Sequence, residues 1–356
     1  MIGWEAAWKH TIGLPDGTPQ WLVASIALIL TFSFVVLPSA AVISYLDRKL
    51  SADLQARVGP NRAGPSGVLQ PIADLLKLLQ KRGDGPIEPS EVLWTIFQTM
   101  VLYSTLALLP LGSLVLIVDT DMSVYLTFLA TLLLALGTLL MGLGQRSVPG
   151  WLGGIRVAAQ ASAATFPALL AVLCAGMRAG GFSWTAMIAA QGVSPLRWAA
   201  LSNPFEFVAA IVFVISGLVL LSVRPLDGGL GTQDLQGGVA SRVSGRRLSL
   251  LKLGRFYGFF LWSVMAVVLF IGGLSLPTGI VETLRDSEAW RTIQFLELLV
   301  LLIKTFALMI LIAMVGTVTP RLRADQITDF CWKVLSPFAL LALAGTAVWI
   351  GWAYFI

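Results

Sequence analysis

Apolar runs of bilayer length recur along this chain and constrain its fold more strongly than any other feature. A helix of roughly 20 apolar residues crosses the hydrocarbon core of a membrane, where only helices and closed barrels satisfy the backbone. Seven runs carry almost no charge and one more contains two charges. They cover residues 21–46, 92–118, 122–145, 157–177, 207–223, 256 to about 276, about 295 to 316, and 334–356. The sequence therefore predicts an all-α polytopic membrane protein with eight transmembrane helices.

The fifth run is the shortest, at 17 residues, but a helix-start signal precedes it. Asn203 is a favourable N-cap residue, Pro204 suits the first turn, and Glu206 stands at the N3 position. We therefore expect this helix to begin before its charge-free run does.

The composition leaves no room for a soluble domain of ordinary size. Hydrophobic residues make up 57% of the chain and charged residues only 12%, which is typical of helical membrane proteins. We expect residues 1–356 to form a single membrane domain with loops at about 47–91, 146–156, 224–255 and 317–333. Glu5 precedes the first apolar run and no small-residue cleavage site follows it, so we expect no removable signal peptide.

Basic residues are distributed unevenly between the two sides of the predicted bundle. Those four loops hold eighteen of the 24 lysines and arginines, the opposite segments hold five, and Lys304 lies within a run. Because basic residues concentrate on the cytoplasmic side, the four loops are predicted to be cytoplasmic, and both termini to lie on the outer side. The same bias explains the net charge of +5 without any nucleic acid partner.

The longest polar interruption is the segment from Asp47 to Glu88, between the first two runs. Its glycines and prolines at positions 59, 60, 64, 65 and 67 prevent one continuous helix, so we expect two short helices around a turn. The second has apolar residues at helical spacing and Pro71 in its first turn. These apolar residues are Val68, Leu69, Ile72, Leu75, Leu76 and Leu79. This amphipathic helix is predicted to lie along the membrane interface or against a partner; the plainer alternative is a surface anchor.

Metal-binding side chains are too sparse to form a centre. Cys174 and Cys331 stand apart, and His10 is the only histidine. Zinc and iron–sulfur sites need clustered thiolates or imidazoles. We therefore expect no metal-ligated or covalent cofactor here, and any redox cofactor would belong to a partner.

Two ionisable residues of the seventh run are candidates for function, because charges inside membrane spans are costly. Lys304 lies deep in the run, and Glu297 lies seven residues earlier on the same helix face, about two turns away. The pair could line a polar cavity or a proton path, and the alternative is a structural tie to a neighbouring helix. The third loop is net positive despite Asp227 and Asp234, which suits an acidic partner or lipid headgroups.

A series of residues along the first loop resembles the corresponding loop of a known family. The series is Arg48, Gln55, Arg57, Gly59-Pro60-Asn61-Arg62, Gly64, Leu69-Gln70, Ala73-Asp74 and Lys77. It resembles the membrane subunit of proton-translocating NADH:quinone oxidoreductase, respiratory complex I, that is called H in bacteria and 1 in mitochondria. Further similar segments cover most of the chain. They are Arg156 with Ala159-Gln160, Pro225-Leu226-Asp227 with Ser244-Gly245, Lys304-Thr305, and Pro320-Arg321 with Arg323 and Asp325-Gln326.

This resemblance implies an eight-helix component of a bacterial inner membrane complex, with helices at the entrance and roof of a quinone chamber. Electrons would pass from NADH through flavin and iron–sulfur clusters on peripheral-arm subunits to quinone, coupled to proton movement; further partners would be other membrane-arm subunits and the lipid bilayer. The implied chamber and arm-contact residues are Asp47, Arg48, Arg57, Asn61, Arg62, Asp74 and Lys77. The candidates for a proton path or polar cavity are Glu297, Lys304, Asp227, Asp234, Arg156 and Gln160.

Several positions depart from the family pattern. Asp47 replaces a glutamate and keeps its charge, Thr165 replaces another, and the arginine expected near Gly316 is missing. The family's third-loop glutamates correspond to Leu230, Thr232, Asp234, Arg242 and Arg255. Carboxylates with raised pKa values relay protons, so the usual coupling route is incomplete. Another chain would supply the acids, or this is a divergent copy with altered coupling, another electron donor or acceptor, or a scaffolding role.

Two other classes of function remain open from the sequence. One is the homologous membrane anchor of a related hydrogenase or ferredoxin oxidoreductase, in which no quinone need bind. The other is a stand-alone transporter or structural anchor, although neither paired interrupted helices nor inverted repeats, which transporters commonly have, are evident in this sequence.

Overall fold

The computed structural model is helical throughout the residues that it describes, which are 19–81, 89–111, 119–145, 147–192, 194–230, 238–240, 243, 245–275 and 290–355. No strand occurs among them. The elements are α2 (Gln20–Thr31), η1 (Phe32–Val36), α3 (Leu37–Leu54), η2 (Pro65–Gly67), α4 (Gln70–Gln80), α5 (Pro89–Ala107), α6 (Ser123–Gly144), α7 (Val148–Ala179), α8 (Trp184–Ala190), η3 (Pro195–Arg197), α9 (Ala199–Ser202), α10 (Pro204–Leu220), α11 (Gly245–Phe270), α13 (Trp290–Val318), α14 (Ala324–Phe330), η4 (Cys331–Leu335) and α15 (Ser336–Phe355).

Six helical stretches of the described chain are long and apolar enough to cross a membrane. They are α2 to α3 as one rod, α6, α7, α11, α13, and α14 to α15 as one rod. The other two predicted spans fall on α5 and α10, whose apolar parts are shorter. The structure thus confirms a helical membrane protein, and the total of eight crossings stays a prediction.

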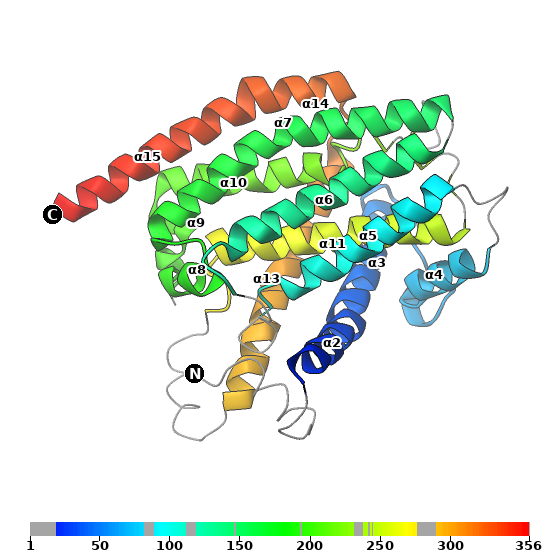
Figure 1. Cartoon of the computed structure of the whole chain (residues 1–356), viewed down its shortest axis with the longest axis horizontal. Helices are drawn as coiled ribbons and strands as arrows, with labels where there is room; N and C mark the ends of the chain where they lie inside the picture. The colour runs from blue at the N-terminus through cyan, green and yellow to red at the C-terminus, as the bar shows by residue number, and fades with distance from the viewer. Residues whose placement is uncertain are drawn as a thin grey trace.

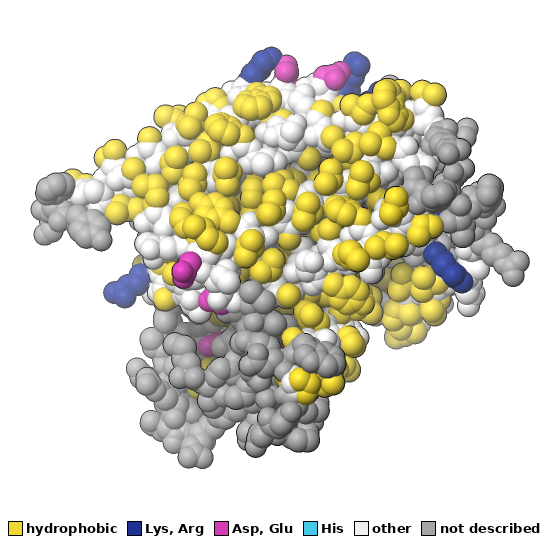
Figure 2. Space-filling model, in the orientation of Figure 1, with side chains coloured by type: hydrophobic (Ala, Val, Ile, Leu, Met, Phe, Trp, Pro, Cys, Tyr) yellow, Lys and Arg dark blue, Asp and Glu magenta, His cyan; other side chains and the backbone are white. Residues whose placement is uncertain are grey.

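The helices form a bundle in which α7 packs against α6, α10 and α15, while α11 runs through the interior (Figure 1). The rod α2–α3 and helix α13 run steeply across the others and pack against each other through α3 (Figure 1). Figure 2 shows hydrophobic side chains spread over the visible face of the bundle, with charged side chains towards its rims. This distribution suits a surface in contact with lipid or other apolar chains.

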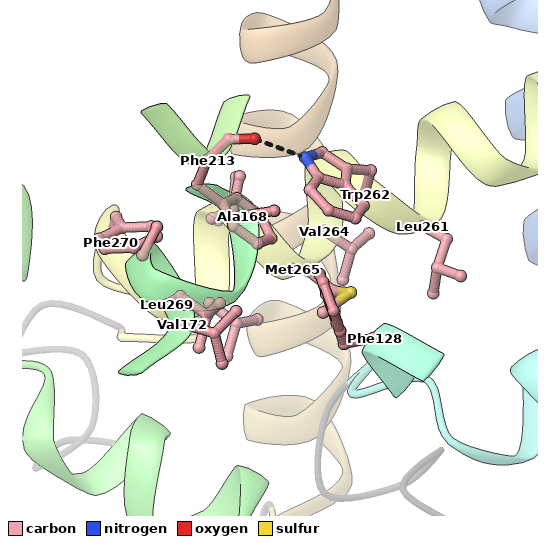
Figure 3. Close-up of a cluster of buried hydrophobic side chains, with 14 of the residues drawn as sticks. Phe128, Ala168, Val172, Phe213, Leu261, Trp262, Val264, Met265, Leu269 and Phe270 are labelled. Atoms are coloured by element: carbon pink, nitrogen blue, oxygen red, sulfur yellow. Dashed lines mark hydrogen bonds between the residues drawn. The ribbon is translucent and has the colours of Figure 1, made fainter. Parts of the chain in front are cut away.

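The core centres on the second half of α11, where Tyr257 to Phe270 are all buried. Trp262 stacks on Phe213 of α10 with ring centroids 4.4 Å apart, and its indole Nε1 donates to the Phe213 carbonyl oxygen at 3.0 Å (Figure 3). Gly217 leaves the space that this indole occupies. Because α11 is apolar all round at this level, it is the central helix of the bundle.

Three helices extend beyond the charge-free runs into segments that the sequence predicts as loops. Ser147 caps α7 by accepting from the Gly150 amide at 3.3 Å, so the predicted loop 146–156 lies mostly in a helix. Helix α11 begins at Gly245, which shortens the loop 224–255. Helix α3 continues to Leu54, so the first of the two expected short helices is the end of the first rod.

Two local predictions are confirmed. Asn203 caps α10, with its Oδ1 accepting from the Phe205 amide at 3.0 Å, and the helix begins at Pro204. Helix α4 carries Pro71 in its first turn. Its apolar side chains are largely exposed: Leu69, Ile72, Leu76 and Leu79. The position of α4 at a membrane interface stays a prediction.

Candidate functional site

A pocket lies where α3, α11, α13 and the segment after α10 meet. Its empty volume is about 480 Å³, which includes the part open to the surroundings. Apolar side chains form most of its wall: Ile43, Val223, Phe256, Phe259, Ile312 and Ala313. Asp47, Arg224 and Arg255 also line it. An apolar wall with a few convergent charged groups is the usual composition of a small-molecule site.

The Asp47 carboxylate and the Arg224 guanidinium, which both line the pocket, form an ion pair with Oδ2 and Nη2 2.5 Å apart. Asp47 stands near the end of α3, where the apolar run gives way to charge, while Arg224 follows α10 in the segment that turns back towards α11. Both side chains are half-buried. The pair therefore joins residues 177 positions apart in the wall of the pocket.

A second ion pair lies in the segment after α10. Asp227 is buried and its Oδ1 lies 3.6 Å from Nε of Arg321. The Leu322 amide donates to the carbonyl oxygen of Pro225 at 3.3 Å, so the segment before α14 is tied to the same place. Arg255 interacts electrostatically with Asp47, Asp227, Arg224 and Arg321. These five residues form a cluster with one more positive than negative charge.

Glycines allow the segment after α10 to approach its neighbours. A Cβ at position 316 of α13 would lie 2.7 Å from the Arg224 carbonyl oxygen. The residue after Asp227 is Gly228, and a Cβ there would lie 2.8 Å from Nε2 of Gln160 on α7. Such separations are too short for a side chain. The Arg224 backbone occupies the space that a side chain at position 316 would need, which agrees with the absence of the arginine expected near Gly316.

Helix α4 is attached beside the cluster by polar contacts. Arg48 of α3 and Asp74 of α4 form an ion pair at 2.5 Å, and Gln70 donates to Asp74 at 2.9 Å. Partial burial favours a higher pKa for Asp74, but the hydrogen bonds from Gln70 and Arg48 and the charge of Arg48 outweigh it and lower the pKa below its ordinary value. Arg246 of α11 also donates to the Leu79 carbonyl oxygen at 3.2 Å. The first loop is thus docked on α3 and α11.

Comparison with known proteins identifies the family. The family model for NADH dehydrogenase matches residues 26–347. The chain is 32% identical to the H subunit of NADH-quinone oxidoreductase from Anaeromyxobacter dehalogenans over 362 residues, covering 98% of this chain and 85% of that protein. The chain belongs to the H-subunit family of NADH-quinone oxidoreductase. The H subunit of Chlorobaculum tepidum is 28% identical, with 92% of each chain covered.

A solved structure shares the fold of this H-subunit homologue. It is a chain of the membrane-bound sulfane sulfur reductase, an archaeal respiratory membrane complex, with a TM-score of 0.77. The match covers 91% of this chain and 99% of that one at 21% identity. At this identity the likeness concerns the fold alone.

The predicted chamber residues of this H-subunit homologue separate into two groups. Asp47 lines the pocket, and Arg48 and Asp74 hold α4 beside it. The side chains of Arg57, Asn61, Arg62 and Lys77 are exposed on the first loop and do not line the pocket. Their role in contact with a peripheral arm stays a prediction.

The proton-path candidates are also dispersed. Lys304 donates to the Gly273 carbonyl oxygen at 3.1 Å and lies 4.4 Å from the centroid of the Trp198 ring, which ties α13 to neighbouring segments as the structural alternative requires. Glu297 is half-buried on α13, and its pairing with Lys304 stays a prediction. Arg156 lies within α7, and the Gln160 side chain is fully buried there.

The family acid positions divide between described and undescribed parts of the chain. Thr165 is half-buried on α7 and donates to the Ala161 carbonyl oxygen at 2.7 Å, whereas Leu230 is buried. Arg255, expected in a loop, lies in α11. Asp234, Thr232 and Arg242 lie outside the described residues.

Sequence reasoning missed several site residues. Arg224 is predicted only as one basic loop residue among others, although a single arginine directly after an apolar run could have suggested a boundary ion pair. Glu206, predicted only as the N3 residue of its helix, is buried in the first turn of α10 and pairs with Arg178 at 2.9 Å, outside this pocket. The described residues contain no group of three or more metal-ligating side chains. Flavin and iron–sulfur clusters on partner subunits remain a prediction.

Proposed function

We propose that this chain is the quinone-chamber subunit of a complex I-type, proton-translocating NADH:quinone oxidoreductase, and that the pocket at Asp47 and Arg224 is its share of the chamber. Membership of the H-subunit family supports the complex, and the composition of the pocket supports the ligand. The chain itself would bind and orient quinone, while partner-held flavin and iron–sulfur clusters would deliver two electrons, which together with two protons taken up from water convert it to quinol.

The pocket matches quinone in its chemistry. A quinone has a flat ring and an apolar tail, which suit the aliphatic and aromatic wall. Its carbonyl oxygens accept hydrogen bonds, and arginine is the donor that keeps its charge at any ordinary pH. Asp47 pairs with Arg224 in the pocket wall, so the donor is positioned before the ligand arrives.

Helix α4 supports the placement at a membrane surface. Most of its apolar side chains are exposed, while Asp74 pairs with Arg48 of α3 and the Leu79 carbonyl oxygen accepts from Arg246 of α11. An exposed apolar helix face of this kind suits the bilayer interface or a partner protein. We propose that the first loop, held by α4, is the cytoplasmic platform for the peripheral arm.

The test is purification of the assembled complex in mild detergent, followed by assay of NADH-dependent quinone reduction with wild type and Asp47→Asn. Loss of the carboxylate frees Arg224 from its partner, so we expect kcat/KM for quinone to fall about tenfold, the size of a lost charge-assisted hydrogen bond. Asp329→Asn is the matched control, because Asp329 pairs with Lys333 on an exposed surface. Its activity should equal that of wild type.

Three results would contradict the proposal in different ways. Full quinone reductase activity in Asp47→Asn would show that this pocket is not part of the quinone chamber. Co-purification with a nickel–iron subunit and no quinone reduction would favour a hydrogenase-type anchor. A monomer without redox partners would favour a transporter or structural anchor.

A further inference from the structure

Arg255 lies between two pockets of the bundle. It lines the pocket at Asp47, and it also lines a second pocket among α5, α6 and α11 with an empty volume of about 340 Å³, which includes the part open to the surroundings. Besides Arg255, the polar side chains of this second pocket are Gln98, Thr138 and Ser222, in a wall otherwise made of leucine, alanine and glycine. A charged side chain therefore faces an inner space that the quinone proposal does not use.

The second pocket is built around buried polar atoms that lack partners. Gln98 is 2% exposed, and its Oε1 has no hydrogen-bond partner among the described residues. Its amide fits between Gly137 of α6 and Gly254 of α11, where an added Cβ would collide with it. Ser222 is 1% exposed, and its Oγ also has no partner in the described chain. Two such buried groups without hydrogen-bond partners would lower the stability of the folded protein by about a few kcal/mol if no water reached them.

Water is the ligand that satisfies this set of groups. Gln98 Oε1 only accepts hydrogen bonds, the Ser222 hydroxyl does both, and the Arg255 guanidinium only donates. An anion would serve the arginine but not the amide oxygen. Water donates and accepts, and buried waters typically bridge two to four polar groups of this kind.

We propose that the two pockets form one hydrated passage and that Arg255 is a fixed positive charge within it, which admits water and small anions and repels cations, hydronium included. Asp47 and Asp227 are each ion-paired with another arginine, so the five-residue cluster keeps its excess positive charge. An arginine beside a water-filled constriction raises an electrostatic barrier to protons and cations. The passage is inferred from the geometry of the two pockets alone. The role of Arg255 in excluding protons from this passage rests on the proposed function.

Charge-selective labelling of a cysteine in the inner pocket tests this filter. In the assembled complex, Cys174 and Cys331 are replaced by alanine and Ser222→Cys is introduced, which keeps the size of the side chain. An anionic sulfonatoethyl and a cationic trimethylammonioethyl methanethiosulfonate of similar size are compared by their modification rates. We expect the anionic reagent to react faster, and Arg255→Gln to lower the anion-to-cation rate ratio by on the order of tenfold, as removal of a unit charge at close range would do.

Controls separate the charge at position 255 from other effects. Arg255→Lys keeps the charge and should keep the ratio. Lys333→Gln removes a highly exposed charge and should leave the ratio unchanged. Thr138→Cys provides a second reporter on α6 if the Ser222→Cys complex does not assemble.

Two outcomes would overturn the inference. Equal rates for both reagents before and after Arg255→Gln would show that no charge filter exists, and absence of labelling at both reporters would show that the passage does not admit small anions. Labelling needs no electron transfer, so either result with normal quinone reduction leaves the proposed function standing. A wild-type complex that reduces no quinone but shows the expected anion-to-cation rate ratio would contradict the proposed function and leave the charge filter standing.

Discussion

Arg178 and Glu206 form a largely buried ion pair where α7 ends and α10 begins. Arg178 at the end of α7 donates to Glu206 and Ser202 at 2.9 Å each and to the Arg197 carbonyl oxygen at 2.6 Å. Glu206 is only 2% exposed. One guanidinium therefore joins α7, η3 and the start of α10, and an uncompensated buried charge would remain if either partner were removed.

Removal of one partner of this pair should be much more harmful than removal of both. We expect Arg178→Met to destabilise the protein by about 3 kcal/mol, because breaking a buried pair leaves an unpaired charge. Arg178→Met with Glu206→Leu should recover most of that loss. The measurement is thermal unfolding in detergent. Lys333→Met, which breaks an exposed pair, is the control, and a loss in the control equal to that of Arg178→Met would contradict the argument.

Among the elements, α4 depends most on polar contacts, because its apolar face is largely exposed. The Arg48–Asp74 pair holds it to α3, and Gln70, which also belongs to α4, donates to the Asp74 carboxylate. The folded-state pKa of Asp74 is below its ordinary value of 3.8. A lowered pKa stabilises the folded form at pH values above 3.8, and this contribution is lost as the pH falls through the lower, folded value.

The docking of α4 should therefore weaken in acid. We expect Asp74→Asn to increase hydrogen exchange of the α4 amides a few-fold at neutral pH, since a partly exposed pair contributes at most about 1 kcal/mol. The difference between wild type and variant should shrink below pH 3.8, where the carboxylate of the unfolded form is protonated. Exchange mass spectrometry, corrected for intrinsic rates, measures this, with exposed Lys77→Gln as control. A constant difference at all pH values would exclude titration of Asp74 as the cause.

At the scale of the whole molecule, the bundle places α4 and the α8–α9 region at opposite ends (Figure 1). Helices α5, α6 and α7 connect these ends. Three crossings bring the chain to the other face of the membrane, whereas two would return it to the same face. Whether the short helix α5 crosses the membrane therefore determines whether α4 and the α8–α9 region lie on opposite faces.

Labelling from each side of the membrane tests whether α5 crosses. A membrane-impermeant maleimide should label Leu196→Cys in intact spheroplasts and Lys77→Cys only in inverted vesicles, because both positions are exposed and the basic loop is predicted to be cytoplasmic. The native cysteines are buried and serve as the background control. Labelling of both positions from the same side would show that α5 does not cross the membrane, and the number of transmembrane helices would then be smaller than the predicted eight.

The sequence by itself determined the helical membrane class, the approximate position of each long helix and the family, because hydrophobic length and short local motifs such as Asn203-Pro204 are written in consecutive residues. It did not determine the site. Asp47 and Arg224, or Gln98 with Gly137 and Gly254, are far apart along the chain and meet only when α3, α5, α6 and α11 pack. Local patterns carry no information on such pairings, so the charge cluster and the inner pocket were decided by tertiary structure alone.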